Sequence, residues 1–155
     1  MSSATLTGYE YYVTFIDDFS RKTWIYFLRS KRLEEVLLWF QELKALVENQ
    51  TGKKIKVLWS DNGGEYAFCA FDEYCWQEGI KRQLTVPYTP QQNGLAKRKN
   101  HVIVVPTRAM LHDQRLPFFL WAKAFSTVVY VQNKSPNRAL RVKLPRRCIL
   151  GRSLK

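Results

Sequence analysis

Hydrophobic and polar positions along the first half of the chain predict two strands, followed by alternating helices and strands. Residues 11–16 and 23–28 are rich in aromatic and β-branched side chains and flank a polar turn, which is typical of an antiparallel hairpin. Apolar residues then recur at helical spacing from Leu33 to Val47, and Gly52 lies just past that run. A strand, a helix and a second strand are predicted next, over 55–59, 68–79 and 80–86. This order favours a mixed α/β sheet.

The second half of the chain has the pattern of helices. One is predicted over 91–112 and another over 117–133, whereas residues 135–155 show no clear period. Pro106 stands inside the first of these helices, directly after four β-branched residues. An interior proline removes a helix hydrogen bond and costs about 3 kcal/mol, so we expect a kink or a break at this position.

Length and composition predict one hydrophobic core, because 155 residues that are 46% hydrophobic can fill a single domain. Charge is unevenly distributed along the chain, whose net charge is +12. Residues 97–155 carry 14 Lys and Arg against one Asp, whereas residues 1–96 carry 11 against 12 acidic residues. We therefore expect a polyanionic partner, with residues 1–133 as the folded domain and 134–155 as a basic tail. A solvated basic face without a partner is the alternative.

Cysteine usage and hydropathy bear on the location of the protein. Cys69, Cys75 and Cys148 lack CxxC spacing, which favours free thiols, and neither His101 nor His112 lies near a cysteine pair that could bind zinc. No leader-like segment precedes the first predicted strand, and the apolar runs are too short to span a bilayer. We therefore predict an intracellular protein that is neither secreted nor inserted in a membrane.

Two loop segments carry the candidate chemistry. Residues 60–66 read Ser-Asp-Asn-Gly-Gly-Glu-Tyr, so that Asp61 stands directly after a predicted strand. Residues 87–94 read Pro-Tyr-Thr-Pro-Gln-Gln-Asn-Gly and lead to Lys97, with 35 residues between Asp61 and Lys97. Taken alone, Asp-Asn-Gly-Gly is also an ordinary turn after a strand.

Together these segments resemble the integrase catalytic core of copia-type long-terminal-repeat retrotransposons, within the retroviral integrase superfamily. The stretches 11–21, 23–28 and 108–122 match further blocks of that family in order and spacing, so the resemblance covers nearly the whole chain. It implies a fragment of a polyprotein with a ribonuclease H-like α/β fold, in which helices flank a mixed sheet. It also implies DNA integration in the nucleus by a DDE-type polynucleotidyl transferase, with Mg²⁺ as cofactor and DNA as partner.

The resemblance assigns catalytic positions, and one of them is altered here. In the family three carboxylates bind two Mg²⁺ ions; the second matches Asp61, and the third is a Glu where this chain has Lys97. Mg²⁺ requires oxygen ligands. An ammonium about 4 Å from the Asp61 carboxylate would attract that carboxylate by roughly 4 kcal/mol at an effective dielectric near 20. The positions of Asp17 and Asp18 indicate capping of a turn, and the position of Glu65 indicates a solvated loop. None of these carboxylates is therefore expected to restore the triad. We expect weak or no metal binding at Asp61 and an inactive site.

The family's first strand, which carries its first Asp, lies upstream of the match, so the sequence is expected to start after it. In the family that strand is central, between the strands that correspond to 11–16 and 55–59. Unless residues 1–8 substitute for that strand, both neighbouring strands would have backbone groups without hydrogen-bond partners. Each such group that is buried would cost about 1–3 kcal/mol of stability. The expectation is a domain of marginal stability that self-associates or needs a partner.

The resemblance also indicates where DNA would bind. Relatives place basic residues that contact DNA ends in the first turns of the helix after the loop, which here are Lys97, Arg98 and Lys99. The predicted tail adds a sparse basic set suited to non-specific phosphate binding: Arg138, Arg141, Lys143, Arg146 and Arg147.

Three functions stay open at this point. The favoured one is a catalytically inactive integrase-core fragment that retains DNA affinity. The second is an active polynucleotidyl transferase completed by another chain. The third is either a pseudogene product without a folded function or a module that joins intact integrases. We interpret the apolar helix over 118–130 as core, with the interface of a homo-oligomer or an integrase multimer as the alternative.

Overall fold

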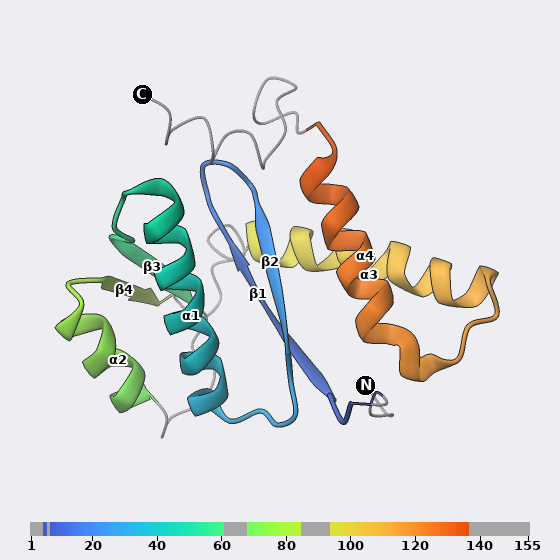
Figure 1. The fold of residues 1–155 in the computed structure, drawn as a ribbon, viewed down its shortest axis with the longest axis horizontal. Coiled ribbons are helices and arrows are strands. Elements are labelled where there is room, and N and C mark those ends of the chain that lie inside the picture. Colours follow the sequence, from blue (N-terminus) through green and yellow to red (C-terminus); the bar gives the residue numbers. More distant parts are fainter. Residues whose placement is uncertain (1–4, 6, 61–67, 85–93, 137–155) are drawn as a thin grey trace. The chain divides into compact units, whose positions relative to one another are not determined.

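The structure is a computed structural model that describes residues 5, 7–60, 68–84 and 94–136 (Figure 1). The chain divides into two compact units, 1–31 with 99–155 and 32–98, which we call the hairpin unit and the parallel-strand unit. Its elements in order are β1 (Tyr11–Ile16), β2 (Thr23–Leu28), α1 (Leu33–Thr51), β3 (Val57–Ser60), α2 (Phe68–Gln77), β4 (Lys81–Leu84), α3 (Gly94–Asp113), a 3-10 turn (Phe118–Leu120) and α4 (Trp121–Lys134). The boundary between the units falls inside α3.

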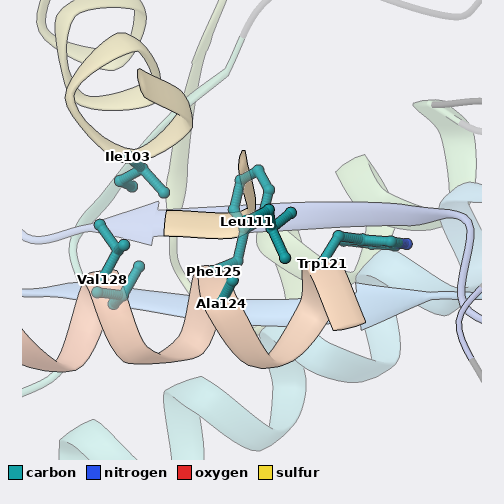
Figure 2. Packing of buried hydrophobic residues seen from close by; sticks show 7 residues of the cluster. Ile103, Leu111, Trp121, Ala124, Phe125 and Val128 are labelled. Carbon is teal, nitrogen blue, oxygen red and sulfur yellow. The ribbon is translucent and has the colours of Figure 1, made fainter. Parts of the chain in front are cut away.

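The hairpin unit is built on β1 and β2, which pair antiparallel in the register Tyr11↔Leu28 to Ile16↔Thr23. Helix α4 packs against β2, and α3 contributes to the same core (Figure 2). The ring of Tyr12 on β1 lies 4.7 Å from that of Phe125 on α4, measured between centroids. The buried members of this core are Ile103, Leu111, Trp121, Ala124, Phe125, Val128 and Val129. The core prediction for the helix over 118–130 is confirmed for Trp121, Phe125, Val128 and Val129, and burial contributes about 1.5–3 kcal/mol for each large apolar side chain. It is wrong for Phe118, Phe119 and Tyr130, which are exposed.

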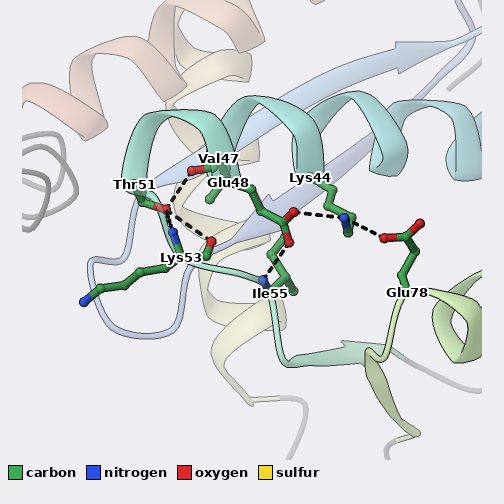
Figure 3. A network of polar contacts seen from close by, with 7 residues as sticks. All are labelled: Lys44, Val47, Glu48, Thr51, Lys53, Ile55 and Glu78. Carbon is green, nitrogen blue, oxygen red and sulfur yellow. Dashed lines mark hydrogen bonds and ion pairs between the residues drawn. The ribbon is translucent and has the colours of Figure 1, made fainter.

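The parallel-strand unit contains α1, α2 and the parallel pair β3 and β4, in the register Val57↔Lys81 to Ser60↔Leu84. The rings of Phe40 on α1 and Phe71 on α2 stack with centroids 5.4 Å apart. Lys44 on α1 lies between the carboxylates of Glu48 and Glu78, 2.9 Å from each (Figure 3). Glu48 also accepts a hydrogen bond of 2.9 Å from the Ile55 N–H, so this network links α1, the approach to β3 and the end of α2.

Most predicted boundaries agree with the structure to within two residues. The strand predicted over 55–59 is β3, shifted to Val57–Ser60, and the helix predicted over 68–79 ends at Gln77. Gly52 ends α1 with φ at 64°, a left-handed conformation that glycine adopts without strain. The predicted strand over 80–86 is β4 over Lys81–Leu84, and its last two positions lie outside the described residues.

The predicted break at Pro106 is wrong, because α3 continues through this residue to Asp113. Proline lacks the N–H that would bond to the carbonyl of Val102, one helical turn earlier. That carbonyl instead accepts a hydrogen bond of 2.9 Å from Nε2 of Gln132 on α4. A side chain from the neighbouring helix thus supplies the missing donor and lowers the cost of the proline.

The strands of the described part of the chain form two separate two-stranded sheets, β1 with β2 and β3 with β4. β1 and β3, which the resemblance would place on either side of its central strand, thus belong to different sheets. Before β1, the Thr5 N–H donates to the Tyr9 carbonyl at 2.9 Å and the Gly8 N–H to the Thr5 carbonyl at 2.9 Å. Gly8 has a φ of 79°, a conformation that favours glycine, and these bonds hold Thr5 beside Tyr9.

Candidate functional site

The start of α3 carries two of the predicted DNA-binding residues. Lys97 and Arg98 are both exposed, and Nε of Arg98 donates a hydrogen bond of 3.0 Å to the Gly94 carbonyl. No acidic side chain is present in the first turn of this helix. Unpaired backbone N–H groups at a helix start carry partial positive charge, so Lys97 adds to a field that favours anions. An exposed ammonium here provides no ligand for a divalent cation.

Lys99 differs from its two neighbours because it is half-buried. Its Nζ lies 3.5 Å from Oε1 of Gln132. Burial and, to a lesser extent, the guanidinium of Arg21 lower the pKa of Lys99 below its ordinary value. Both effects disfavour the charged ammonium, and the second shows that the Lys99 and Arg21 cations lie near each other. An anion placed beside them would be attracted by both side chains.

Contacts between α4 and β2 bring further cations toward Lys99. Oδ1 of Asn133 accepts the Thr23 N–H at 2.9 Å, and Nδ2 of Asn133 donates to the Thr23 carbonyl at 2.7 Å. Residues next to Thr23 and Asn133 in sequence are therefore held at the same end of the hairpin unit as Gln132 and Lys99. We call this group the cationic end, and it consists of Arg21, Lys22, Lys99 and Lys134.

The members of the cationic end also have local contacts. Arg21 forms an ion pair of 2.7 Å with Asp18, and Lys22 lies over the Trp24 ring at 4.7 Å from its centroid. Lys134 similarly lies 4.3 Å from the centroid of the Tyr130 ring. Such aromatic contacts hold a lysine stem in place while the ammonium remains able to meet phosphate.

Of the acidic candidates near β1, Asp17 has the predicted capping role, whereas Asp18 forms an ion pair in place of a cap. Oδ2 of Asp17 accepts the Ser20 N–H at 2.7 Å, and Asp18 pairs with Arg21. Asp61 and Glu65 lie outside the described residues. Within the described ranges no group of three His, Cys, Asp or Glu side chains is placed to bind a metal ion.

The sequence analysis and the structure agree only in part about the basic residues. Lys97, Arg98 and Lys99 lie on α3 as predicted. The other five predicted DNA-binding residues lie outside the described residues: Arg138, Arg141, Lys143, Arg146 and Arg147. Sequence reasoning missed Arg21, Lys22 and Lys134, because only the Asn133–Thr23 contact reveals that these distant positions are neighbours. The polar pair Gln132 and Asn133 at the end of an apolar helix was the available signal.

Comparison with known proteins identifies relatives of this chain. A family model described as Integrase core domain matches residues 2–90. The retrovirus-related Pol polyprotein from transposon TNT 1-94 of Nicotiana tabacum is 47% identical over 147 residues, which are 95% of this chain and 11% of that protein. The corresponding polyprotein from transposon RE2 of Arabidopsis thaliana is 38% identical over 95% of this chain and 10% of that protein. The chain thus spans about a tenth of the length of these relatives.

Solved structures show the same fold at lower identity. The trimeric form of the HTLV-2 integrase catalytic core domain in complex with magnesium has a TM-score of 0.63 and 22% identity, covering 86% of this chain and 80% of that one. A chain of the simian T-cell lymphotropic virus intasome in complex with PP2A regulatory subunit B56 gamma has a TM-score of 0.62 and 21% identity. The match covers 79% of this chain and 41% of that one. The fold is therefore the ribonuclease H-like fold of integrase cores. No helix in the described ranges is long and apolar enough to cross a membrane.

Proposed function

Because the chain belongs to the integrase core domain family, we propose that it binds DNA as an integrase-core fragment without phosphoryl-transfer activity. The observation that supports the loss of activity is Lys97, an exposed cation in the first turn of α3 where the resemblance places a catalytic Glu. DNA integration, and with it a nuclear location, is the process in which the intact relatives would use this domain.

The residues present do not fit the two Mg²⁺ ions that the family implies. An ammonium cannot act as a ligand and repels a divalent cation, so the substitution at Lys97 removes one ligand and adds a repulsive charge. The magnesium in the HTLV-2 core belongs to a protein with 22% identity to this one. No step of the proposed function therefore depends on a metal ion.

Phosphate binding follows from the positions of the cations. Lys97 and Arg98 stand at the start of α3, and the cationic end lies in the hairpin unit, where α4 leads into the basic residues after Pro136. Lys and Arg that contact phosphates release counterions and bind without regard to base sequence. The ligand we propose is duplex DNA, bound through its backbone by a homo-oligomer or a multimer with intact integrases.

Catalysis is tested with a labelled duplex that ends in long-terminal-repeat sequence, incubated with Mg²⁺ or Mn²⁺. We expect neither end processing nor strand transfer at any metal concentration. Metal-dependent cleavage by the parent that disappears in Asp61→Asn would overturn the proposal and favour an active transferase completed by another chain.

DNA binding is tested by fluorescence anisotropy over a series of salt concentrations. Lys134→Ala should weaken binding equally for unrelated duplexes and reduce the slope of log affinity against log salt by about 1. Lys123→Ala is the matched control, because Lys123 is an exposed lysine in the first turn of the same helix, away from the cationic end. If both variants change the slope equally, the cationic end has no special role. If neither variant nor parent shows a salt-dependent affinity, DNA binding itself is refuted.

A further inference from the structure

Lys99 on α3 is a half-buried cation, and no carboxylate among the described residues forms an ion pair with it. Its Nζ lies 3.5 Å from Oε1 of Gln132, which is a neutral oxygen at the long limit of a hydrogen bond. A lysine that is removed from water is ordinarily paired with an acid, because burial disfavours the charged form. The ammonium of Lys99 therefore has no counterion within the described part of the chain to offset its burial.

Gln132 positions Lys99 without supplying a charge. Its Nε2 donates to the Val102 carbonyl at 2.9 Å, so its Oε1 is the amide atom that faces Lys99. The next residue, Asn133, is bonded through both polar atoms of its side chain to the backbone of Thr23, where β2 begins. The end of α4 thus contacts both Lys99 and the start of β2, within the hairpin unit.

The charge that acts on Lys99 from the β1–β2 turn is the guanidinium of Arg21. Burial and, to a lesser extent, this guanidinium lower the pKa of Lys99. Arg21 has a φ of 58°, and its N–H donates to the Asp17 carbonyl at 2.8 Å, which fixes its backbone in the left-handed region. The carboxylates of the turn have other partners, since Asp17 accepts the Ser20 N–H at 2.7 Å and Asp18 pairs with Arg21 at 2.7 Å. The repulsion between Lys99 and Arg21 is therefore offset by an acid only on the Arg21 side.

We propose that Lys99 takes up a proton from solvent when the chain binds DNA, because a phosphate group of the DNA backbone supplies the counterion that Lys99 otherwise lacks. The linkage depends on the DNA binding proposed above and adds a regulation by pH to it. A phosphodiester keeps its negative charge throughout the neutral and alkaline range, so the proton is gained by the amine nitrogen of Lys99 alone. The bound phosphate also attracts Arg21, which offsets the repulsion between the two cations.

The direction of the pH dependence follows from the two states of Lys99. In the free protein its pKa is lowered, and a bound phosphate would raise it again, since an opposite charge favours the ammonium. Affinity for DNA is therefore highest at a pH below the free pKa, where Lys99 is charged in both states. It falls by up to about tenfold per pH unit between the free and the bound pKa, because binding in that range requires the uptake of one proton.

The first test measures the affinity for a duplex by fluorescence anisotropy at constant ionic strength, from about pH 8 to about pH 9.5, for the parent and Lys99→Arg. Arginine keeps its charge throughout this window, so the affinity of Lys99→Arg should not depend on proton uptake at this position. We expect the parent to lose at least about threefold more affinity than Lys99→Arg across the window. The other titratable groups on the elements around Lys99 are common to both proteins and cancel from the ratio of the two affinities: Tyr12, Lys22, His101, Tyr130 and Lys134.

Lys123→Arg is the matched control, because Lys123 is exposed and lies in the first turn of α4, away from the cationic end. This variant should lose affinity with rising pH as the parent does. An equal loss in the parent and in Lys99→Arg would overturn the proton linkage and leave DNA binding intact. Absence of duplex binding by the parent at the start of the window would instead overturn both.

A second measurement on the parent alone guards against failure of the arginine variant to fold. Residue-resolved NMR of the lysine side chains gives the pKa of Lys99 directly, with and without saturating duplex. We expect the duplex to raise this pKa by about half a unit or more, which is the shift that a threefold change in affinity requires. A rise with inorganic phosphate and none with duplex would show that a free anion, and not DNA, is the counterion. That result, or an unchanged pKa with both ligands, would overturn the proposal.

Discussion

The contact between Gln132 and the Val102 carbonyl predicts an energetic coupling between Gln132 and Pro106. Pro106 has no N–H for that carbonyl, and Nε2 of Gln132 donates to it at 2.9 Å. Gln132→Met removes the donor and keeps the length of the side chain. Pro106→Ala restores the backbone donor within α3. We therefore expect the cost of Gln132→Met to depend on which residue occupies position 106.

The magnitude follows from the exposure of the bond. A net hydrogen bond contributes about 0.5–1.5 kcal/mol, and a fully buried unpaired carbonyl costs about 1–3 kcal/mol. Val102 is 49% exposed as a residue, so water can reach this region and the lower range applies. With Pro106 present, Gln132→Met should lower the free energy of unfolding by about 1 kcal/mol. In a Pro106→Ala background the carbonyl has its own helical donor, and the same substitution should cost less than about 0.5 kcal/mol.

The assay is urea denaturation of the parent, both single variants and the double variant. Pro106→Ala alone should stabilise the protein by up to about 3 kcal/mol, less whatever Gln132 already recovers. Thr127→Val is the control, since Oγ1 of Thr127 bonds only within α4, to the Lys123 carbonyl at 2.9 Å, and its effect should be the same in both backgrounds. An equal cost of Gln132→Met with proline and with alanine at position 106 would show that Gln132 does not replace the missing donor.

Two further predictions concern the other polar contacts between elements. Asn133→Ala should lower the free energy of unfolding by about 2–4 kcal/mol in the same assay, because both backbone groups of the buried Thr23 lose their partners; a loss no larger than that of Lys123→Ala would contradict this. Burial alone would raise the pKa of Glu48, but hydrogen bonds from Lys44 and the Ile55 N–H and the charge of Lys44 outweigh it and lower that pKa. A depressed folded pKa gives stability that is present above the unfolded pKa and is lost as pH falls through the folded one. Stability measured from about pH 6 to pH 3 should therefore fall less steeply in Glu48→Gln than in the parent, and parallel curves would refute the role of this network.

Local sequence signals predicted most of the fold. The hairpin of β1 and β2 was predictable to the residue because its aromatic and β-branched runs are bounded by a turn whose Asp17 caps the Ser20 N–H. Helix α1 was predictable from its apolar spacing and from Gly52, which adopts a left-handed conformation at its end. The observed bounds of β3 differ from the predicted ones by one or two residues. Pairing with β4, and not the apolar run, decides where the hydrogen-bonded strand begins.

Features that depend on distant side chains were not predictable from the chain alone. The sequence predicts a kink or a break at Pro106, but α3 continues through this residue, and Gln132 supplies a donor that no local pattern reveals. The cationic end has the same origin, because Lys22 and Lys134 become neighbours through the bonds between Thr23 and Asn133. By contrast, the position of Lys97 on α3 followed from the motif before it, while Asp61 lies outside the described residues.

The residues that join elements and Lys97 belong to different physical classes. Asn133 and Gln132 bond to backbone groups, and Lys44 lies between two carboxylates with its side chain 13% exposed, so replacing any of them leaves polar groups without partners. Lys97 is exposed, and exposed substitutions usually change stability by less than about 0.5 kcal/mol. The proposed loss of a metal ligand at this position is therefore compatible with a folded α3. The proposed loss of catalysis and a retained fold are thus compatible in one chain, because Ile103 and Leu111 of α3 are buried in the same core as α4, whereas Lys97 is exposed.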